Sequence, residues 1–322
     1  MMDDGYTSPR EGPRYPARLY GPVSRRSRTR HRRRRRLLAG LAFAVVAFVA
    51  SKAVLSGSPA HTAHRPLGPG TAYLSQVAAL AGTGPGSLAG MLAAAESDAI
   101  DRTLAITPFV RVAGRQHREI ALTFDDGPGP YTPAVLAVLR RERVPATFFE
   151  VGVLERYFHV STRAIAAAGD VIGDHTEAHA PMSRLSAGDQ RRQLLEDASV
   201  IGRYGAAFPR LFRPPYGMFN AKTLALLRRY RMLMVLWTID TNDYRRAGVR
   251  AIVHAAVAGA RPGAIVLLHD AGGNRAQTVA ALPKIIAALR AGGYALVTVP
   301  RLLLDNPAPA HQNLAALAPG GR

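Results

Sequence analysis

Two adjacent aspartates, Asp125 and Asp126, stand in the stretch Ala121–Pro130, which reads ALTFDDGPGP. The run Ile120–Phe124 before them is typical of a buried strand, and the glycines and prolines after them end it. Repulsion between two carboxylates this close normally keeps one of them protonated unless a cation lies beside them. A solvated turn is the ordinary alternative for Asp-Gly and Gly-Pro sequences. The buried strand before the pair favours a positively charged partner instead.

Polar residues follow four other apolar segments in the same way. The groups are His175–His179 (HTEAH), Arg213–Gly217 (RPPYG), Asp240–Tyr244 (DTNDY) and His269–Asp270 (HD). Two histidines spaced four apart can face the same way on a helical turn, and a carboxylate from another strand can complete a set of metal ligands. An isolated H-x-x-x-H motif is weak evidence, because surface histidines can have this spacing too. Together with the aspartate pair, it predicts that one aspartate binds a metal ion and the other stays ionised as a base.

The elements that must position these groups alternate between strand-like and helix-like from about residue 105. The expected strands are 120–124, 146–151, 170–173, 210–213, 232–239, 264–268 and 294–298. The expected helices are 133–143, 161–168, 187–203, 221–230, 248–259 and 276–291. This alternation predicts an α/β fold with parallel strands and helices outside, preceded by a hairpin in which 107–119 folds back on 120–124. Whether the sheet closes into a barrel or stays open, a site is expected where strands end.

The chain contains the motifs TFDDGP, HTxxH, RPPYG, DxxD and LLH. In their order and in the intervals between them, these motifs resemble those of the polysaccharide deacetylase family. The shared unit of this family is often called the NodB homology domain, and it is similar to carbohydrate esterase family 4. The chain resembles it over about residues 118–300. The resemblance implies a distorted (β/α) barrel of about seven parallel strands. It also implies a divalent metal ion, commonly Zn²⁺ with Co²⁺ or another divalent ion as alternatives, that serves hydrolysis of N-acetyl groups on an aminosugar polymer.

The resemblance also implies roles for the acidic and histidine motifs. Three residues correspond to the metal ligands of the family: Asp126, His175 and His179. Asp125 corresponds to the general base, and Arg213 would orient it and keep it ionised. An exposed arginine in a proline-rich turn is the alternative for Arg213. This chemistry is consistent, because a metal lowers the pKa of bound water from 15.7 to about 7 and a carboxylate can accept its proton.

The remaining roles concern the oxyanion and the leaving group. The backbone N–H of Tyr216 corresponds to the oxyanion donor of the family. His269 corresponds to the general acid, and Asp243 beside it would raise its pKa. The family usually has tryptophan where this chain has Tyr244, while Trp237 precedes the motif. The packing of the substrate wall is therefore expected to differ from that of the family.

The N-terminal region predicts a membrane anchor. Residues 1–36 contain twelve arginines and three acidic residues, and the apolar run 37–55 follows directly. As a helix this run spans roughly 28 Å, close to the ~30 Å core of a bilayer. The positive-inside rule then places the basic tail in the cytoplasm and the catalytic domain outside. The alternative is a cleaved signal peptide with a site at Ser58–Ala60 and a secreted product.

The rest of the chain divides by composition. Residues 56–70 are expected to form a linker, 71–117 an Ala-rich accessory region with the hairpin, 118–305 the deacetylase domain, and 306–322 a disordered tail. The chain has no cysteine, so no disulfide stabilises it. The basic tail is a candidate for nucleic-acid binding, but its place before an apolar run favours contact with anionic lipid, and no nucleic-acid partner is expected. No oligomeric state is predicted.

The expected function is a membrane-anchored, metal-dependent deacetylase that acts on N-acetylglucosamine units of an extracellular glycan, either peptidoglycan or a chitin-like polymer. An esterase that removes O-acetyl groups from a glycan is an alternative, because the same site would attack an ester more easily. An inactive wall-binding module is a second alternative. It is disfavoured because the base and all the metal ligands expected from the family are present.

Overall fold

The computed structural model describes residues 87–204 and 206–314. Nine strands form one sheet in this part of the chain. In chain order they are β1 (Phe109–Val110), β2 (Glu119–Gly127), β3 (Thr147–Glu150), β4 (Val171–Asp174), β5 (Leu211–Phe212), β6 (Leu233–Val235), β7 (Ile239–Asp240), β8 (Ala264–His269) and β9 (Ala295–Val297). The spatial order is β1-β6-β5-β4-β3-β2-β8-β7, and β9 also pairs with β2.

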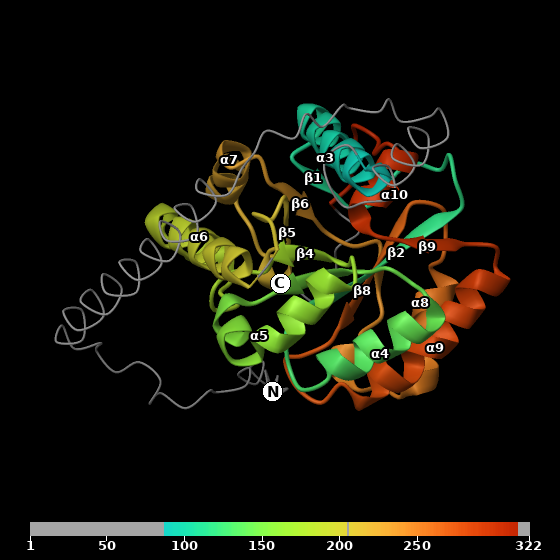
Figure 1. Cartoon of the computed structure of the whole chain (residues 1–322). Coiled ribbons are helices and arrows are strands. Elements are labelled where there is room, and N and C mark those ends of the chain that lie inside the picture. The colour runs from blue at the N-terminus through green and yellow to red at the C-terminus, as the bar shows by residue number, and fades with distance from the viewer. Residues whose placement is uncertain (1–86, 205, 315–322) are drawn as a thin grey trace, which may run out of the picture. The chain divides into compact units, whose positions relative to one another are not determined.

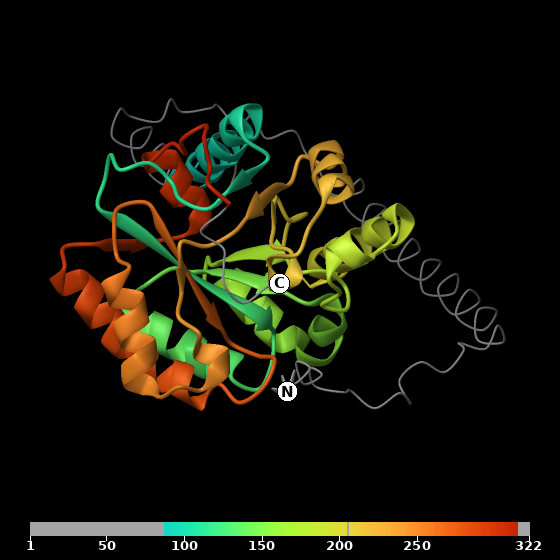
Figure 2. The same ribbon diagram turned by 180° about the vertical axis from the view of Figure 1, so that it is seen from behind.

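Helices surround this sheet, as Figure 1 and, from behind, Figure 2 show. They are α3 (Leu88–Ile106), α4 (Thr132–Glu142), α5 (Gly152–Ala167), α6 (Ala187–Arg203), α7 (Ala221–Arg229), α8 (Val249–Ala258), α9 (Ala276–Ala291) and α10 (Val299–Asp305). The strand pairs are parallel, so the α/β prediction is confirmed. The sheet is an incompletely closed barrel, with β1 and β7 at the two ends of its strand order.

Two local predictions were wrong. The segment 107–119 does not form a hairpin with β2: its strand β1 pairs in parallel with β6, Phe109 opposite Met234. The expected strand 232–239 is divided into β6 and β7, which pair with different neighbours, β5 and β8. Pairing between segments more than a hundred residues apart leaves no signal in local periodicity.

The largest apolar cluster lies around β2 and β8, the strands that carry the candidate site. Phe124 of β2 stacks on Phe148 of β3 with ring centroids 5.1 Å apart, and both rings are fully buried. From outside, α9 contributes buried side chains at positions 281, 282, 285, 286 and 289, the spacing of one helical face. This packing fixes the strand ends on which the polar residues stand.

The accessory region forms one helix in its described part. α3 begins at an N-cap, Ser87, whose hydroxyl accepts the N–H of Gly90, and the helix packs against α10. Residues 306–314, expected to be disordered, are hydrogen bonded: the Gln312 side chain accepts the N–H of Arg111 and donates to the carbonyl of Val112.

The basic tail 1–36, the expected anchor 37–55 and the linker 56–70 lie outside the described residues. In the described part of the chain, no helix combines the length and the apolar character needed to cross a bilayer.

Candidate active site

The aspartate pair stands at the carboxyl end of β2. In a regular strand, adjacent side chains point to opposite faces of the sheet. Here the register with β3 shifts between Asp125 and Gly127, and Asp126 has a φ of 71°. Asp125 is 3% exposed and opposes His269 of β8 in register. The irregular strand end allows both carboxylates to turn toward the same site.

Asp126 meets two histidines from the segment after β4. Its Oδ1 is 3.0 Å from Nε2 of His179 and 3.6 Å from Nε2 of His175. The ligand atoms of the three residues lie within 4.8 Å of one another. Burial raises the pKa of Asp126, but the two imidazoles beside its carboxylate outweigh burial and hold this pKa well below the usual range.

These three residues fit a divalent metal ion. One carboxylate oxygen and two imidazole nitrogens are a donor set of the zinc class. Nδ1 of His175 lies 2.7 Å from the carbonyl oxygen of Arg213, to which its N–H donates a hydrogen bond. Nε2 therefore faces the site with a lone pair that can bind a metal ion. His175 and His179 therefore belong to a candidate metal site and are not merely two histidines on a surface loop.

Buried carboxyl groups hold the histidine segment in place. Oδ2 of Asp197, on α6, accepts the N–H of His175 at 3.0 Å, and Oδ1 of Asp174 accepts the N–H of Thr176 at 2.9 Å. Thr176 and His179 have positive φ values of 73° and 52°, conformations that non-glycine residues seldom adopt. Hydrogen bonds to the segment help to maintain these unfavourable backbone conformations.

Arg213 is a buried partner of Asp125 and not an exposed residue of a turn. Its side chain is fully buried, with the guanidinium above the ring of Phe149. Its Nη1 donates to Oδ1 of Asp125 at 2.7 Å and to Oγ1 of Thr123 at 2.8 Å. Nε donates to the carbonyl of Val235 at 3.0 Å. The guanidinium thus pairs with the Asp125 carboxylate and fixes its orientation, as the predicted role of general base requires.

His269 is paired with Asp243. Nδ1 of His269 lies 2.7 Å from Oδ1 of Asp243, and Oδ2 of Asp243 accepts both the His269 backbone N–H and the Thr278 hydroxyl. Burial lowers the pKa of His269, but the charge of Asp243 raises it more, to about 9. The histidine is therefore protonated at neutral pH, and Nε2 is the ring nitrogen that Asp243 does not engage.

Comparison with known proteins places the chain in a family. Residues 113–235 match the family model described as polysaccharide deacetylase. The chain is 37% identical over 198 residues to a chitooligosaccharide deacetylase of Bradyrhizobium sp. (strain ANU 289), covering 58% of this chain and 90% of that protein. The chain belongs to the polysaccharide deacetylase family. It is also 39% identical over 187 residues to a peptidoglycan-N-acetylglucosamine deacetylase of Bacillus cereus, covering 57% of this chain and 87% of that protein.

Solved structures of the polysaccharide deacetylase family have the same fold. The Bc1960 peptidoglycan N-acetylglucosamine deacetylase superposes with a TM-score of 0.60 at 29% identity, covering 65% of this chain and 97% of that one. A family 4 carbohydrate esterase from Streptomyces lividans, in complex with acetate, gives 0.53 at 31% identity, covering 55% and 91%. BA3943 of Bacillus anthracis, a family pseudoenzyme, gives 0.58 at 28% identity, covering 61% and 69%.

In this member of the polysaccharide deacetylase family, two exposed tyrosines flank the site. Tyr216, at a φ of 59° in the turn Pro215–Gly217, is 61% exposed, and its ring centroid is 4.7 Å from that of His179. Tyr244, at the position where the resemblance led us to expect tryptophan, is 40% exposed, and its ring centroid is 5.4 Å from that of His269. Aromatic faces at both edges suit stacking against a sugar ring.

Sequence reasoning missed several residues around this site. Asp270 is fully buried beneath the aspartate pair and accepts the Thr132 hydroxyl, which in turn accepts the N–H of Gly129. Arg275 and Asp197 were missed as well, since neither stands directly after a strand. Only the HD dipeptide at residue 269 gave a signal, and it was used for His269 alone.

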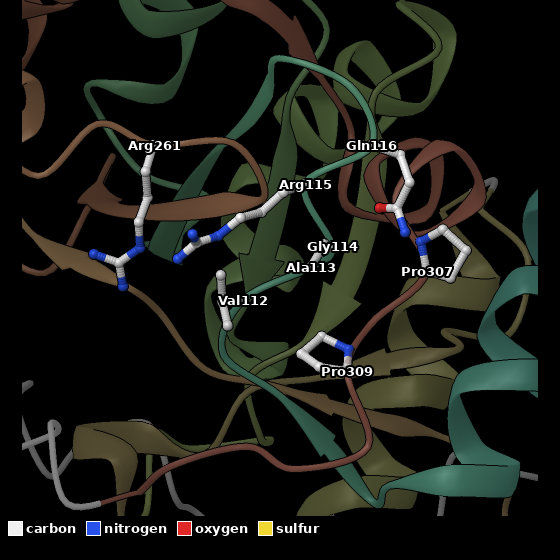
Figure 3. Close-up of a pocket in the computed structure, with 8 residues that line it drawn as sticks. All are labelled: Val112, Ala113, Gly114, Arg115, Gln116, Arg261, Pro307 and Pro309. Atoms are coloured by element: carbon white, nitrogen blue, oxygen red, sulfur yellow. The ribbon is translucent and has the colours of Figure 1, made fainter.

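The pocket of Figure 3, about 500 Å³ in volume, lies elsewhere. Arg115 and Arg261 line one side of it and Pro307 another. Val112, which also lines the pocket, forms a β-bridge with Ala264, the first residue of β8, whereas His269 is the last residue of that strand. The pocket is therefore at the opposite end of the strand from the candidate active site.

Proposed function

We propose that the protein is a metal-dependent hydrolase that removes N-acetyl groups from N-acetylglucosamine units of peptidoglycan or a chitin-like glycan. One observation carries this proposal: three metal-ligand side chains, an ion-paired carboxylate and a carboxylate-paired histidine converge at the carboxyl ends of the parallel strands. The names of the similar proteins, which include peptidoglycan and chitooligosaccharide deacetylases, support this substrate class.

Asp126, His175 and His179 would hold the metal ion, for which we propose Zn²⁺. When bound, such an ion supplies a water of lowered pKa and a positive charge for the acyl oxygen. The donor set itself is compatible with other divalent ions.

The remaining residues would move protons and stabilise charge. Arg213 engages Oδ1 of Asp125, and Oδ2 lies 3.8 Å from Nε2 of His175, next to the ligands, where it can accept a proton from water. His269, held protonated by Asp243, can donate from Nε2 to the leaving amine. The backbone N–H of Tyr216 is the proposed oxyanion donor, a kind of contact whose loss typically costs about 10²–10³ in rate.

Acetate release tests this function. The full-length protein is incubated with N-acetylglucosamine oligomers and with O-acetylated glycans, with and without EDTA. We expect release from the N-acetylated substrate that EDTA abolishes and Zn²⁺ or Co²⁺ restores. His179→Ala should remove this activity, whereas His117→Ala, which changes an exposed histidine outside the site, should keep it. Activity that is indifferent to EDTA would refute the metal site.

The same assay separates the two alternatives. Faster release from the O-acetylated glycan would indicate an esterase. Glycan binding without acetate release, unchanged between the wild type and Asp125→Asn, would indicate a pseudoenzyme such as BA3943.

We propose that residues 37–55 anchor the protein in the cell membrane, with residues 1–36 in the cytoplasm and the deacetylase domain, 118–305, outside. The apolar run and the arginines before it support this topology. Protease added to intact cells should digest the domain but leave an N-terminal fragment in the membrane. Recovery of the whole domain in the medium would instead support cleavage after Ser58–Ala60 and secretion.

A further inference from the structure

Arg275 is a buried cation beside the metal-ligand residue Asp126, and none of the sequence motifs includes it. It lies between β8 and α9, and it is only 4% exposed. Its Nη2 is 3.9 Å from Oδ2 of Asp126. Within residues 87–204 and 206–314, Asp126 is the only carboxylate within ion-pair distance of this guanidinium.

The same guanidinium fastens its own segment. Nε donates to the carbonyl oxygen of Ala271, and Nη2 donates to that of Gly272 at 3.0 Å. Gly272 has a φ of 71°, and a methyl group there would collide with Oδ2 of Asp126. The Arg275 side chain therefore joins a backbone turn to the carboxylate oxygen that lies against that turn.

The two oxygens of Asp126 consequently have different surroundings. Oδ1 lies toward the imidazoles, 3.0 Å from His179, whereas Oδ2 lies toward Gly272 and Arg275. The backbone of Asp126, at a φ of 71°, is in a conformation that contacts around it must maintain. We propose that Arg275 is a positioning residue: by attracting Oδ2 and fixing the turn behind it, it presents Oδ1 to the metal ion. This inference rests on the proposed metal site.

Groups that orient a metal ligand from behind commonly change metal affinity or activity by about 10–100-fold when they are removed. A purely structural role is the competing account, because Arg275 also immediately precedes α9 and stabilises the turn. That account predicts a loss of stability without a change in the ligand field of the metal. The two accounts therefore differ in the properties of the bound ion and not only in catalytic rate.

The test uses the full-length protein and two measurements. The dissociation constant for Zn²⁺ is obtained by competition with a chromophoric chelator, and the visible absorption of the Co²⁺ form reports the ligand geometry. For Arg275→Gln we expect about 10–100-fold weaker Zn²⁺ binding and an altered Co²⁺ spectrum. Arg275→Lys keeps the charge but not the planar fork, so its affinity should be intermediate.

Arg111→Gln is the matched control. Arg111 is also buried, at 7% exposed, and donates to the carbonyls of Trp237 and Asn313, but it contacts no proposed metal ligand. It should leave both measurements unchanged.

A folded Arg275→Gln variant with wild-type Zn²⁺ affinity and Co²⁺ spectrum would overturn the inference. If that variant does not fold, Arg275→Lys decides, since wild-type affinity and spectrum in the lysine variant would equally overturn it. If the proposed metal site itself is wrong, the result differs: His179→Ala would bind Zn²⁺ with the same affinity as the wild type.

Discussion

Replacing Asp243 with asparagine tests how the proposed general acid keeps its proton. Burial lowers the pKa of His269, but Asp243, whose Oδ1 is 2.7 Å from Nδ1, raises it from 6.5 to about 9. At 1.36 kcal/mol per pKa unit, this rise corresponds to about 3 kcal/mol in favour of the imidazolium form. Asparagine has nearly the same shape as aspartate but no charge, so the substitution removes chiefly the electrostatic contribution.

In Asp243→Asn, burial then dominates, and we expect the pKa of His269 to fall to about 6.5 or below. At pH 8 the protonated fraction would fall from about nine-tenths to about one-thirtieth, and the rate with it. A bound dication repels the imidazolium in both proteins, so it lowers both pKa values and leaves the direction of the difference intact.

The assay is kcat/KM for acetate release as a function of pH. The alkaline limb of the profile should move to lower pH by about 2.5 units or more in Asp243→Asn. Asp240→Asn is the control: Asp240 also interacts with the charge of His269, but its Oδ1 accepts the N–H of Asn242 and makes no hydrogen bond to the imidazole, so the alkaline limb should move much less. Coincident alkaline limbs for Asp243→Asn and the wild type would refute the assigned role of the pair.

The pH dependence of protein stability is a second test of the ion pair between His269 and Asp243. Because the pKa of His269 is raised in the folded state, the pair contributes stability that is fully present below pH 6.5 and is lost as the pH rises toward about 9. The free energy of unfolding of the wild type, relative to Asp243→Asn, should therefore decrease across this range.

Three further predictions concern other residues. Burial, with repulsion from neighbouring carboxylates, raises the pKa of Glu155 to about 10. The free energy of unfolding of the wild type should therefore fall as the pH rises above 4.5. In urea unfolding, Glu155→Gln should become more stable relative to the wild type as the pH rises, by up to about 1.4 kcal/mol per pH unit. Arg213→Lys leaves one nitrogen where the guanidinium uses Nη1 for Asp125 and Thr123 and Nε for the carbonyl of Val235, so kcat should fall by about 10²-fold or more and the free energy of unfolding by about 3 kcal/mol. Wild-type values of both would contradict the role given to Arg213. Tyr216→Gly keeps the backbone N–H and accepts a φ of 59°, so kcat should stay within about tenfold while KM rises; a loss of 10²-fold or more in kcat would show that the side chain acts in the reaction.

The elements near the site were predictable because they are built from strong local signals. Continuous apolar runs give β2 and β8, and turn residues mark their ends, so the polar groups after them could be placed on one rim. That β2 and β8 are neighbours, so that Asp125 lies beside His269, was not predictable in this way, because the two strands are more than a hundred residues apart in the sequence.

Contacts that depend on packing between distant segments were not predictable. Asp197 stands in the middle of α6 and resembles a surface residue in sequence, and only the packing of this helix on α5 and β4 buries it against His175. The start of α5 at Gly152 was also missed, since the strand and the helix join there without a marked turn. The same limitation hid Arg275, whose partner Asp126 is about 150 residues away in the sequence.

Four residues of the site, Asp126, Thr176, His179 and Tyr216, are held at positive φ. Each such conformation costs of order 1–3 kcal/mol and persists only while its surroundings enforce it. Four of the eight non-glycine residues at positive φ in the described part of the chain therefore belong to the site, so backbone strain is concentrated there. On mild heating or at low denaturant concentration, this rim should relax first, so deacetylation would cease while the helices and the sheet remain intact.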